Sequence, residues 1–321
     1  MILAKLNARG IQLSFCLFAM LVLTFALGSV SAEIKLNDNL AISGFLDMST
    51  VTTMGDETET SLSFDQFEMD FHLNYGSVTG QVDIDSTDPD QGIKLEQGFV
   101  TYTAPKDMLP GVSITAGRFL SSLGFEAAEP TGLYQYSFSE GIPYPGYQNG
   151  VAVNVKPMKE AGLYVSFVSS VWDVNETDAG TPGVEAQLAL TPIEQITAKV
   201  GYALDAMDDY TQTELNAWVS FAQGPLTLAG EIDLLGNWGA DGNSGMHFLG
   251  MANVSLADIV SAPVGVTLRF SGIDTDHGGT STEFTFSPSY SATDNWLLLA
   301  EFKQRLDAEE TIIAVESLFT Y

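Results

Sequence analysis

The chain has only one cysteine, Cys16, and it lies within the first 32 residues. Those residues have the layout of a secretory signal peptide: Lys5 and Arg9 precede an apolar run over 11–27, and small residues allow cleavage after Ala32. A membrane-anchoring helix is the alternative, and it fits less well because the run is short and ends in small residues rather than in charges. The exported chain would then contain no cysteine, which excludes a disulfide framework.

Basic residues are also scarce, with 12 Lys and Arg against 41 Asp and Glu and a net charge of −29. Without the signal peptide the charge becomes about −31 over about 289 residues. Nucleic acid is excluded as a partner, because phosphate binding requires a basic face. Disorder is excluded as well, because 45% of the residues are hydrophobic.

No apolar run of membrane-helix length follows the signal peptide, and no segment there has the period of an amphipathic helix. Instead, about sixteen segments alternate apolar and polar residues, most clearly over 64–75, where Phe67, Met69 and Phe71 have polar or charged neighbours. One face of such a strand suits lipid and the other suits water. In lipid, only a closed barrel pairs every strand hydrogen bond. We therefore predict an all-β chain whose residues 33–321 form one transmembrane antiparallel β-barrel of about sixteen strands, with fourteen as the alternative.

The connections between the expected strands fall into two alternating classes. One class is short or contains proline, which suits periplasmic turns, and the other is acidic, as in 205–209 and 274–277, which suits outer loops. A soluble β-sandwich, the alternative fold, has no reason to sort its loops in this way. The last expected strand also ends on an aromatic residue, Tyr321, as is usual for outer-membrane barrels. The expected strands are 40–52, 64–75, 78–85, 93–104, 112–119, 150–157, 162–172, 184–191, 196–204, 213–222, 226–235, 246–256, 264–273, 282–292, 296–305 and 311–321.

These features predict a protein of the outer membrane of Gram-negative bacteria. Its surroundings would be outer-membrane lipid and lipopolysaccharide. The acidic outer loops offer oxygen ligands, without the spacing of an EF-hand, so we expect them to hold divalent cations loosely.

A barrel of sixteen strands is too wide for side chains to fill, so it would enclose an aqueous channel. Acidic residues outnumber basic ones on the expected lumen face. A low-dielectric wall focuses their field, so small cations should enter more readily than anions. The alternative is that these residues only solvate the wall. The candidate wall residues are Glu68, Asp70, Lys94, Glu96, Arg269, Lys303 and Arg305.

The long segment 120–149 has no regular pattern and is rich in glycine, proline and aromatic residues. Loops of this length are usually functional, and folded into the lumen this one would narrow the pore. Its glutamates would then face basic wall residues, with Arg118 as one candidate partner, and its tyrosines could form a stacking track for sugars. The alternative is an external loop packed on itself. The candidate constriction residues of the segment are Glu126, Glu129, Tyr134, Tyr136 and Glu140.

The same region resembles a known family. Residues 96–102 read Glu-Gln-Gly-Phe-Val-Thr-Tyr, residues 114–119 read Ile-Thr-Ala-Gly-Arg-Phe and residues 124–126 read Gly-Phe-Glu, and the pairs Tyr136-Ser137 and Gly150-Val151 follow. Together these motifs are similar to the OmpL-like group of β-barrel porins. The resemblance implies an outer-membrane pore whose substrate is loosely defined.

We expect a porin for passive diffusion of small hydrophilic solutes and ions, mildly cation-selective, with no catalytic site, cofactor or bound metal. An enzyme is disfavoured because only three histidines occur, His72, His247 and His277, and no G-x-S-x-G motif presents a nucleophilic serine. The alternative function is a non-conducting surface protein, such as an adhesin, receptor or envelope scaffold, whose lumen is plugged by the long segment. A homotrimer is compatible with a general porin, although no residue specifies it.

Overall fold

The computed structural model describes residues 33–87, 92–126, 129–177, 180, 182–206, 210–238 and 242–321. The expected signal peptide, residues 1–32, lies outside the described residues. The described chain is almost wholly β-sheet, with one 3₁₀ turn, η1 (Pro130–Gly132), and one four-residue helix, α2 (Ala257–Val260). No helix in this part of the chain is long and apolar enough to span a membrane.

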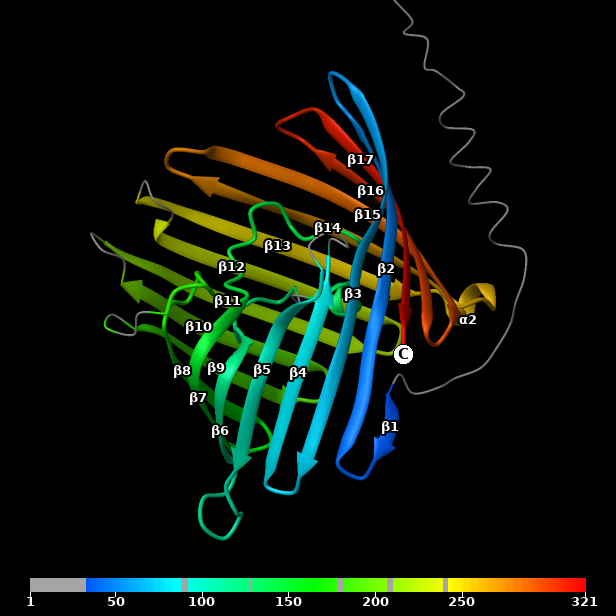
Figure 1. The fold of residues 1–321 in the computed structure, drawn as a ribbon. Helices are drawn as coiled ribbons and strands as arrows, with labels where there is room; N and C mark the ends of the chain where they lie inside the picture. The colour runs from blue at the N-terminus through cyan, green and yellow to red at the C-terminus, as the bar shows by residue number, and fades with distance from the viewer. Residues whose placement is uncertain are drawn as a thin grey trace, which may run out of the picture.

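Sixteen strands, β2 to β17, form one closed antiparallel barrel within the described residues (Figure 1). Each strand pairs with the next in sequence, and β17 pairs with β2, which closes the ring. The prediction of a sixteen-stranded antiparallel β-barrel is therefore confirmed. The strands are β2 (Leu40–Met54), β3 (Thr58–Tyr75), β4 (Val78–Ser86), β5 (Lys94–Thr103), β6 (Val112–Leu120), β7 (Tyr147–Met158), β8 (Ala161–Val168), β9 (Gly183–Ile193), β10 (Ile196–Ala206), β11 (Thr211–Gln223), β12 (Leu226–Trp238), β13 (Asn243–Ser255), β14 (Val264–Thr275), β15 (Gly279–Thr293), β16 (Trp296–Arg305) and β17 (Glu310–Thr320).

The strands differ from expectation mainly at their ends. β3 begins six residues earlier than expected, because its ladder with β2 continues as far as the pair Met54 and Thr58 although the side chains there are exposed and show no alternation. β8 ends four residues early, at Val168, because the backbone beyond it hydrogen-bonds to a side chain instead of to a neighbouring strand. The Val171 N–H donates to Asp205 Oδ2 at 2.7 Å. A short strand β1 (Ile34–Asn37), which pairs with the start of β2, and α2 were not expected, since four residues are too few to show a period.

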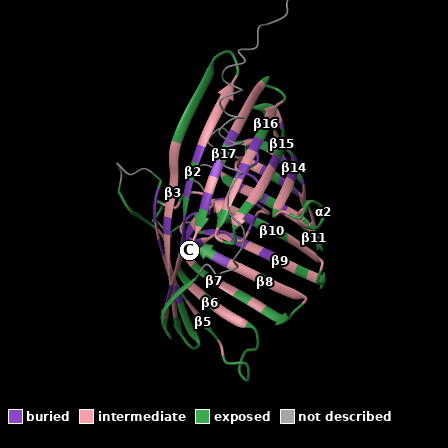
Figure 2. Ribbon diagram, turned by 90° about the vertical axis from the view of Figure 1, so that its right-hand side faces the viewer, coloured by how far each residue is buried: buried purple, intermediate pink, exposed green. Residues whose placement is uncertain are grey.

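Burial along the strands is the reverse of that in a soluble protein. In β14, Leu268 is 43% exposed whereas its neighbour Arg269 is 1% exposed, and in β17 Val315 is 41% exposed beside Glu316 at 3%. Figure 2 shows this alternation as buried bands on several strands, such as β17. Because successive side chains of a strand point to opposite faces, the apolar set faces outward and the polar set inward. A barrel that spans a bilayer requires this arrangement.

The closing seam ends in a close contact between Gly44 and Tyr321. Their backbones exchange two hydrogen bonds of 3.0 Å each, and the Tyr321 hydroxyl donates to the carbonyl oxygen of Glu68 at 2.9 Å. A Cβ atom added to Gly44 would overlap the Glu68 carbonyl oxygen and lie 2.8 Å from the Tyr321 hydroxyl oxygen. The seam therefore requires a residue without a side chain at position 44.

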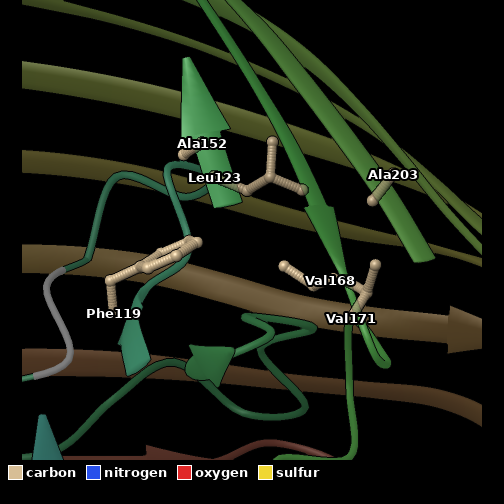
Figure 3. Packing of buried hydrophobic residues seen from close by; sticks show 6 residues of the cluster. All are labelled: Phe119, Leu123, Ala152, Val168, Val171 and Ala203. Carbon is tan, nitrogen blue, oxygen red and sulfur yellow. The ribbon is translucent and has the colours of Figure 1, made fainter. Parts of the chain in front are cut away.

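A small apolar cluster lies where the chain leaves β6. It joins the end of that strand to the neighbouring strands and to the first residues of the long connection that follows. Its packing fixes the direction in which the connection starts. The cluster consists of Phe119, Leu123, Ala152, Val168, Val171 and Ala203 (Figure 3).

Leu268→Arg should lower the free energy of unfolding by about 2–4 kcal/mol, because it sets a guanidinium on the apolar outer face near the middle of β14. Urea unfolding in lipid vesicles, followed by tryptophan fluorescence, measures this. Ile259→Arg, on the exposed helix α2, is the matched control and should leave stability unchanged. Equal stability of the two variants would contradict a lipid-facing role for the outer residues.

Gly44→Ala should destabilise the barrel by about 1–3 kcal/mol, because the new methyl group overlaps the carbonyl oxygen of Glu68 on β3 and crowds the ring of Tyr321. Gly55→Ala is the control, since a Cβ there has no atom within 4 Å. The fraction of barrel that resists unfolding in dodecyl sulfate, read as a heat-dependent gel shift, compares the two. An unchanged fraction for Gly44→Ala would show that the seam tolerates a side chain.

Candidate functional site

We call residues 121–146, which connect β6 and β7, the inner segment. Its described residues hydrogen-bond to inward-facing side chains of β2, β9, β11, β12, β13, β14, β15 and β16. Figure 1 shows it running inside the ring of strands. It therefore crosses the lumen and reaches the far wall.

The first contact of the inner segment is with Glu185 of β9, which is fully buried. Its Oε2 accepts a hydrogen bond from Ser121 Oγ at 2.7 Å, and its Oε1 accepts from the Ser122 N–H and Oγ at 2.7 and 2.6 Å. Gln148 Nε2, at the start of β7, donates to Oε2 at 2.9 Å. One wall carboxylate thus joins the start of the inner segment to the start of β7 through charge-assisted hydrogen bonds.

The next contacts are with β11 and β12. The Phe125 N–H donates to Glu231 Oε1 at 2.9 Å, and the Gly124 N–H donates to Asn216 Oδ1 at 3.3 Å. Asn216 Nδ2 donates to Glu231 Oε1 at 2.7 Å and to Asp233 Oδ1 at 2.6 Å. The wall therefore binds the backbone of the segment, so this part of the contact does not depend on which side chains the segment carries.

Arg269 of β14 is the centre of the largest group of contacts. Its Nη1 lies 2.6 Å from Glu126 Oε1 of the inner segment, and its Nη2 lies 2.7 Å from Glu283 Oε1 of β15. The guanidinium also donates to the carbonyl oxygens of Ser137 and Phe138, at 2.6 and 3.0 Å. A planar guanidinium with several fixed donors suits such a buried junction. Arg269 thereby ties two separate parts of the inner segment to the wall.

Two more contacts fix the second half of the inner segment. Ser137 donates from its N–H and its Oγ to the two carboxylate oxygens of Glu301 on β16, at 3.1 and 2.6 Å. Arg305, at the end of the same strand, lies 3.1 Å from Glu140 Oε1. Both side chains of this second pair are partly exposed, so solvent screens it more than the Arg269 pairs.

Three side chains form a hydrogen-bonded relay in the same order as a hydrolytic triad: Ser139, His247 and Asp233. Ser139 Oγ lies 3.0 Å from His247 Nε2, and His247 Nδ1 lies 2.7 Å from Asp233 Oδ2. The three side chains are 3%, 0% and 1% exposed, respectively. A nucleophilic serine must be reachable by its substrate, and this one is sealed between the inner segment and the wall. The relay therefore fixes the segment rather than presenting a nucleophile.

The tyrosines of the inner segment are used for positioning. The hydroxyl of Tyr136 shares a hydrogen bond with Ser49 Oγ of β2 at 3.0 Å, and the carbonyl oxygen of Tyr134 accepts from Thr267 Oγ1 of β14 at 2.8 Å. Burial, and to a smaller extent the charge of Glu185, raises the pKa of Tyr144, so its hydroxyl keeps its proton. Of these rings, that of Tyr134 is the most open, at 37% exposure.

Acidic side chains gather on the wall formed by β3, β4 and β5. Glu68 and Asp70 on β3 and Glu96 on β5 lie on the inward face, and Glu129 of the inner segment joins them. Single carboxylate oxygens of Glu68, Glu96 and Glu129 lie within 4.8 Å of one another. The Tyr147 hydroxyl donates a hydrogen bond to Glu129 Oε1 at 2.6 Å. Negative charge is thus concentrated on this wall, next to the inner segment.

The remaining predicted site residues are more scattered. Lys303 Nζ lies 3.6 Å from Glu283 Oε2, whereas Lys94 is exposed at the first residue of β5, opposite Asp85. The guanidinium of Arg118 lies 5.8 Å from the centre of the Tyr147 ring. Arg118 is one candidate partner for a glutamate of the inner segment. The structure instead pairs Glu126 with Arg269 and Glu140 with Arg305.

Two cavities open at the end of the barrel that carries the β3–β4 and β7–β8 turns. One, of about 370 Å³, lies against β1 to β4 and is lined by His72 and Gln81, among others. The other, of about 230 Å³, lies against β7 to β10 and contains Lys156, Lys159 and Lys199. The lumen at this end therefore has open space next to β1 to β4 and next to β7 to β10.

A family model described as "Putative beta-barrel porin-2, OmpL-like" matches residues 57–317. The chain belongs to this family. The OmpL-like resemblance of its motifs is thereby confirmed, and membership identifies an outer-membrane porin channel. The family and its fold are those of channels rather than enzymes, which agrees with the sealed position of the serine relay.

The fold of this OmpL-like porin is shared with solved porins from several bacteria. DcaP, an outer-membrane channel of Acinetobacter baumannii, is 14% identical with a TM-score of 0.66, over 88% of this chain and 97% of that one. Salmonella typhi OmpF, solved with daunomycin, is 10% identical with a TM-score of 0.69, over 90% and 100%. An anion-selective porin from Comamonas acidovorans is 11% identical with a TM-score of 0.64, over 88% and 99%. A search among curated proteins found no significant match.

The sequence indicates only some of the residues that hold the inner segment in place, since Glu126, Glu140, Arg269 and Arg305 are among its candidates. Ser121, Ser122 and Ser139 were not proposed as site residues, and His247 was considered only for catalysis. The one available signal is that Ser137 and Ser139 alternate within a segment that is otherwise aromatic and glycine-rich. Their partners lie more than a hundred residues away, so no local pattern reveals them.

Arg269→Met should lower the free energy of unfolding by about 3–5 kcal/mol, because it leaves Glu126 and Glu283 buried without their arginine. Adding Glu126→Gln should recover part of that loss. Lys35→Met is the control, since the pair of Lys35 with Asp38 is exposed and contributes little. Chemical unfolding of the three variants in detergent tests this, and an Arg269→Met barrel as stable as the control would contradict the central role of Arg269.

Proposed function

We propose that this outer-membrane porin lets small hydrophilic solutes diffuse passively and prefers cations to anions. The observation that carries the proposal is the unequal neutralisation of the two sides of the lumen. The basic side chains of β14 and β16 are matched by carboxylates, whereas the acidic wall of β3 to β5 has no such partner among the described residues.

The ion pairs support the statement that the basic side chains of β14 and β16 are neutralised. Arg269 is matched by Glu126 and Glu283, and Arg305 lies within 4 Å of both Glu140 and Glu310. Because these cations are paired, their field is largely cancelled along the passage. Anions therefore meet little attraction on this side of the lumen.

On the opposite wall, formed by β3 to β5, the described carboxylates are not neutralised by basic side chains. In the described chain, no ion pair joins Glu68, Asp70 or Glu96 to a lysine, arginine or histidine. A run of negative charge along a low-dielectric wall raises the local concentration of small cations. The selectivity of a fold relative such as the Comamonas porin, which is anion-selective, belongs to its own wall residues.

The proposal includes four further points. The chain is exported by a signal peptide cleaved after Ala32, and the acidic outer loops contact lipopolysaccharide through loosely held divalent cations. The inner segment constricts the pore, and the assembly is a homotrimer. The alternative, a non-conducting adhesin, receptor or scaffold plugged by the inner segment, makes the opposite prediction for conductance.

Single-channel recording of the refolded mature barrel in a planar bilayer, under a KCl gradient, tests the proposal. We expect stable conductance steps and a reversal potential on the cation-selective side. The double variant Glu96→Gln/Glu129→Gln should shift that potential towards zero, because it removes two charges from the acidic wall and keeps the shape of both side chains.

Asp258→Asn is the matched control, since Asp258 lies on α2 outside the ring of strands. It should leave the reversal potential unchanged. Stable steps without cation preference would overturn the selectivity. A folded, heat-modifiable barrel that never conducts would overturn the channel and favour the surface protein.

A further inference from the structure

Four carboxylates form a square on the inward face of β3 and β4. Across the ladder, Glu68 lies directly opposite Asp85, and Asp70 lies directly opposite Asp83. Because side chains two residues apart share one face of a strand, all four are neighbours. Like charges directly opposite each other destabilise a sheet, so two adjacent pairs of them call for a compensating group.

Asp83 is the most buried member of the square, with no exposed surface. Its Oδ2 accepts hydrogen bonds from Gln81 Nε2 and Gln97 Nε2, at 2.8 and 2.7 Å. Its Oδ1 is buried and has no hydrogen-bond partner. A buried carboxylate oxygen without a donor calls for a compensating partner, and a bound cation can be that partner.

Asp70 repeats this pattern from the facing strand. Its Oδ2 accepts from Ser43 Oγ at 2.8 Å, while its Oδ1 is buried and has no hydrogen-bond partner. Ser43 Oγ also lies 2.8 Å from His72 Nε2, so the histidine is engaged by the serine. The two oxygens without partners therefore belong to the two aspartates that face each other.

The distances fit a single ion. One carboxylate oxygen each from Glu68, Asp70 and Asp83 lies within 4.8 Å of the others. Oxygens that coordinate Ca²⁺ lie about 2.3–2.6 Å from it, so two ligands of one ion are at most about 5 Å apart. Mg²⁺ requires a near-ideal octahedron and shorter bonds, which an irregular set of side chains on two strands suits less well.

We propose that Glu68, Asp70 and Asp83 bind one Ca²⁺ ion on the inward wall of the barrel. The two aspartates supply one carboxylate oxygen each, and Glu68 supplies the third. Glu96 and Glu129, which group around the same Glu68, extend the negative charge that attracts it. The site differs in position and in burial from the exposed acidic loops, and it does not depend on whether the barrel conducts.

Calcium titration of the refolded mature barrel in detergent, after removal of metal with a chelator, tests the proposal. Isothermal calorimetry should give one saturable site, and Ca²⁺ should raise the unfolding temperature, because a ligand that binds only the folded state stabilises it. Asp70→Asn/Asp83→Asn keeps the side-chain shapes and should weaken binding at least tenfold. Asp274→Asn/Asp276→Asn, in an acidic outer loop, is the matched control and should bind as the wild type does.

Three outcomes would overturn the site. They are no saturable binding by a folded wild-type barrel at millimolar Ca²⁺, unchanged affinity in Asp70→Asn/Asp83→Asn, or an equal loss in the outer-loop control. If the double variant does not fold, the single variant Asp70→Asn provides the same comparison. A barrel that conducts with cation preference and binds no Ca²⁺ would overturn this site alone, whereas a calcium-binding barrel that does not conduct would leave it standing.

Discussion

The pairing of every backbone N–H and C=O group is the constraint on which the rest of this structure depends. Hydrocarbon offers no water to an unpaired strand edge, so a sheet in a bilayer must close on itself. Here β17 closes onto β2, and glycine at position 44 lets the last residue approach the seam. Closure with sixteen strands fixes a wide interior, and the period of two sends every second side chain into it. The polar lumen is thus a consequence of the closed sheet.

A wide polar lumen raises the question of how its charges are balanced, and the two halves of this barrel differ. On β9, β12, β15 and β16, wall carboxylates accept hydrogen bonds from backbone N–H groups of the inner segment, and Arg269 of β14 joins two glutamates. The inner segment replaces water there as the hydrogen-bonding partner of the wall. On β3 to β5, no ion pair among the described residues joins Glu68, Asp70 or Glu96 to a basic side chain. The proposed cation preference and the proposed calcium site both rest on that remaining, unpaired half.

Alternation with period two was enough to predict the fold, because the sequence of each strand shows which of its residues face the lumen and which face the lipid. The pattern over 64–75 is the clearest example. It failed where the side chains of both faces meet water, as at the start of β3, and where an element is too short to show a period, as in β1. Which residues of the inner segment and the wall pair with one another was not predictable for a different reason. Arg269 and Glu126 lie 143 residues apart, and a pairing at that distance depends on closure of the whole ring.

The inner segment also has a mechanical consequence. A sheet of sixteen strands closed into a tube is a thin shell, and such a shell bends easily from a circular to an oval cross-section. The segment leaves the wall between β6 and β7 and is attached to β2, β9 and β11 to β16, so it acts as a brace across the tube. Lateral pressure in the membrane would therefore load Glu185, Arg269 and Glu301 first, and the stiffness of this barrel comes from polar attachments within its lumen as much as from its wall.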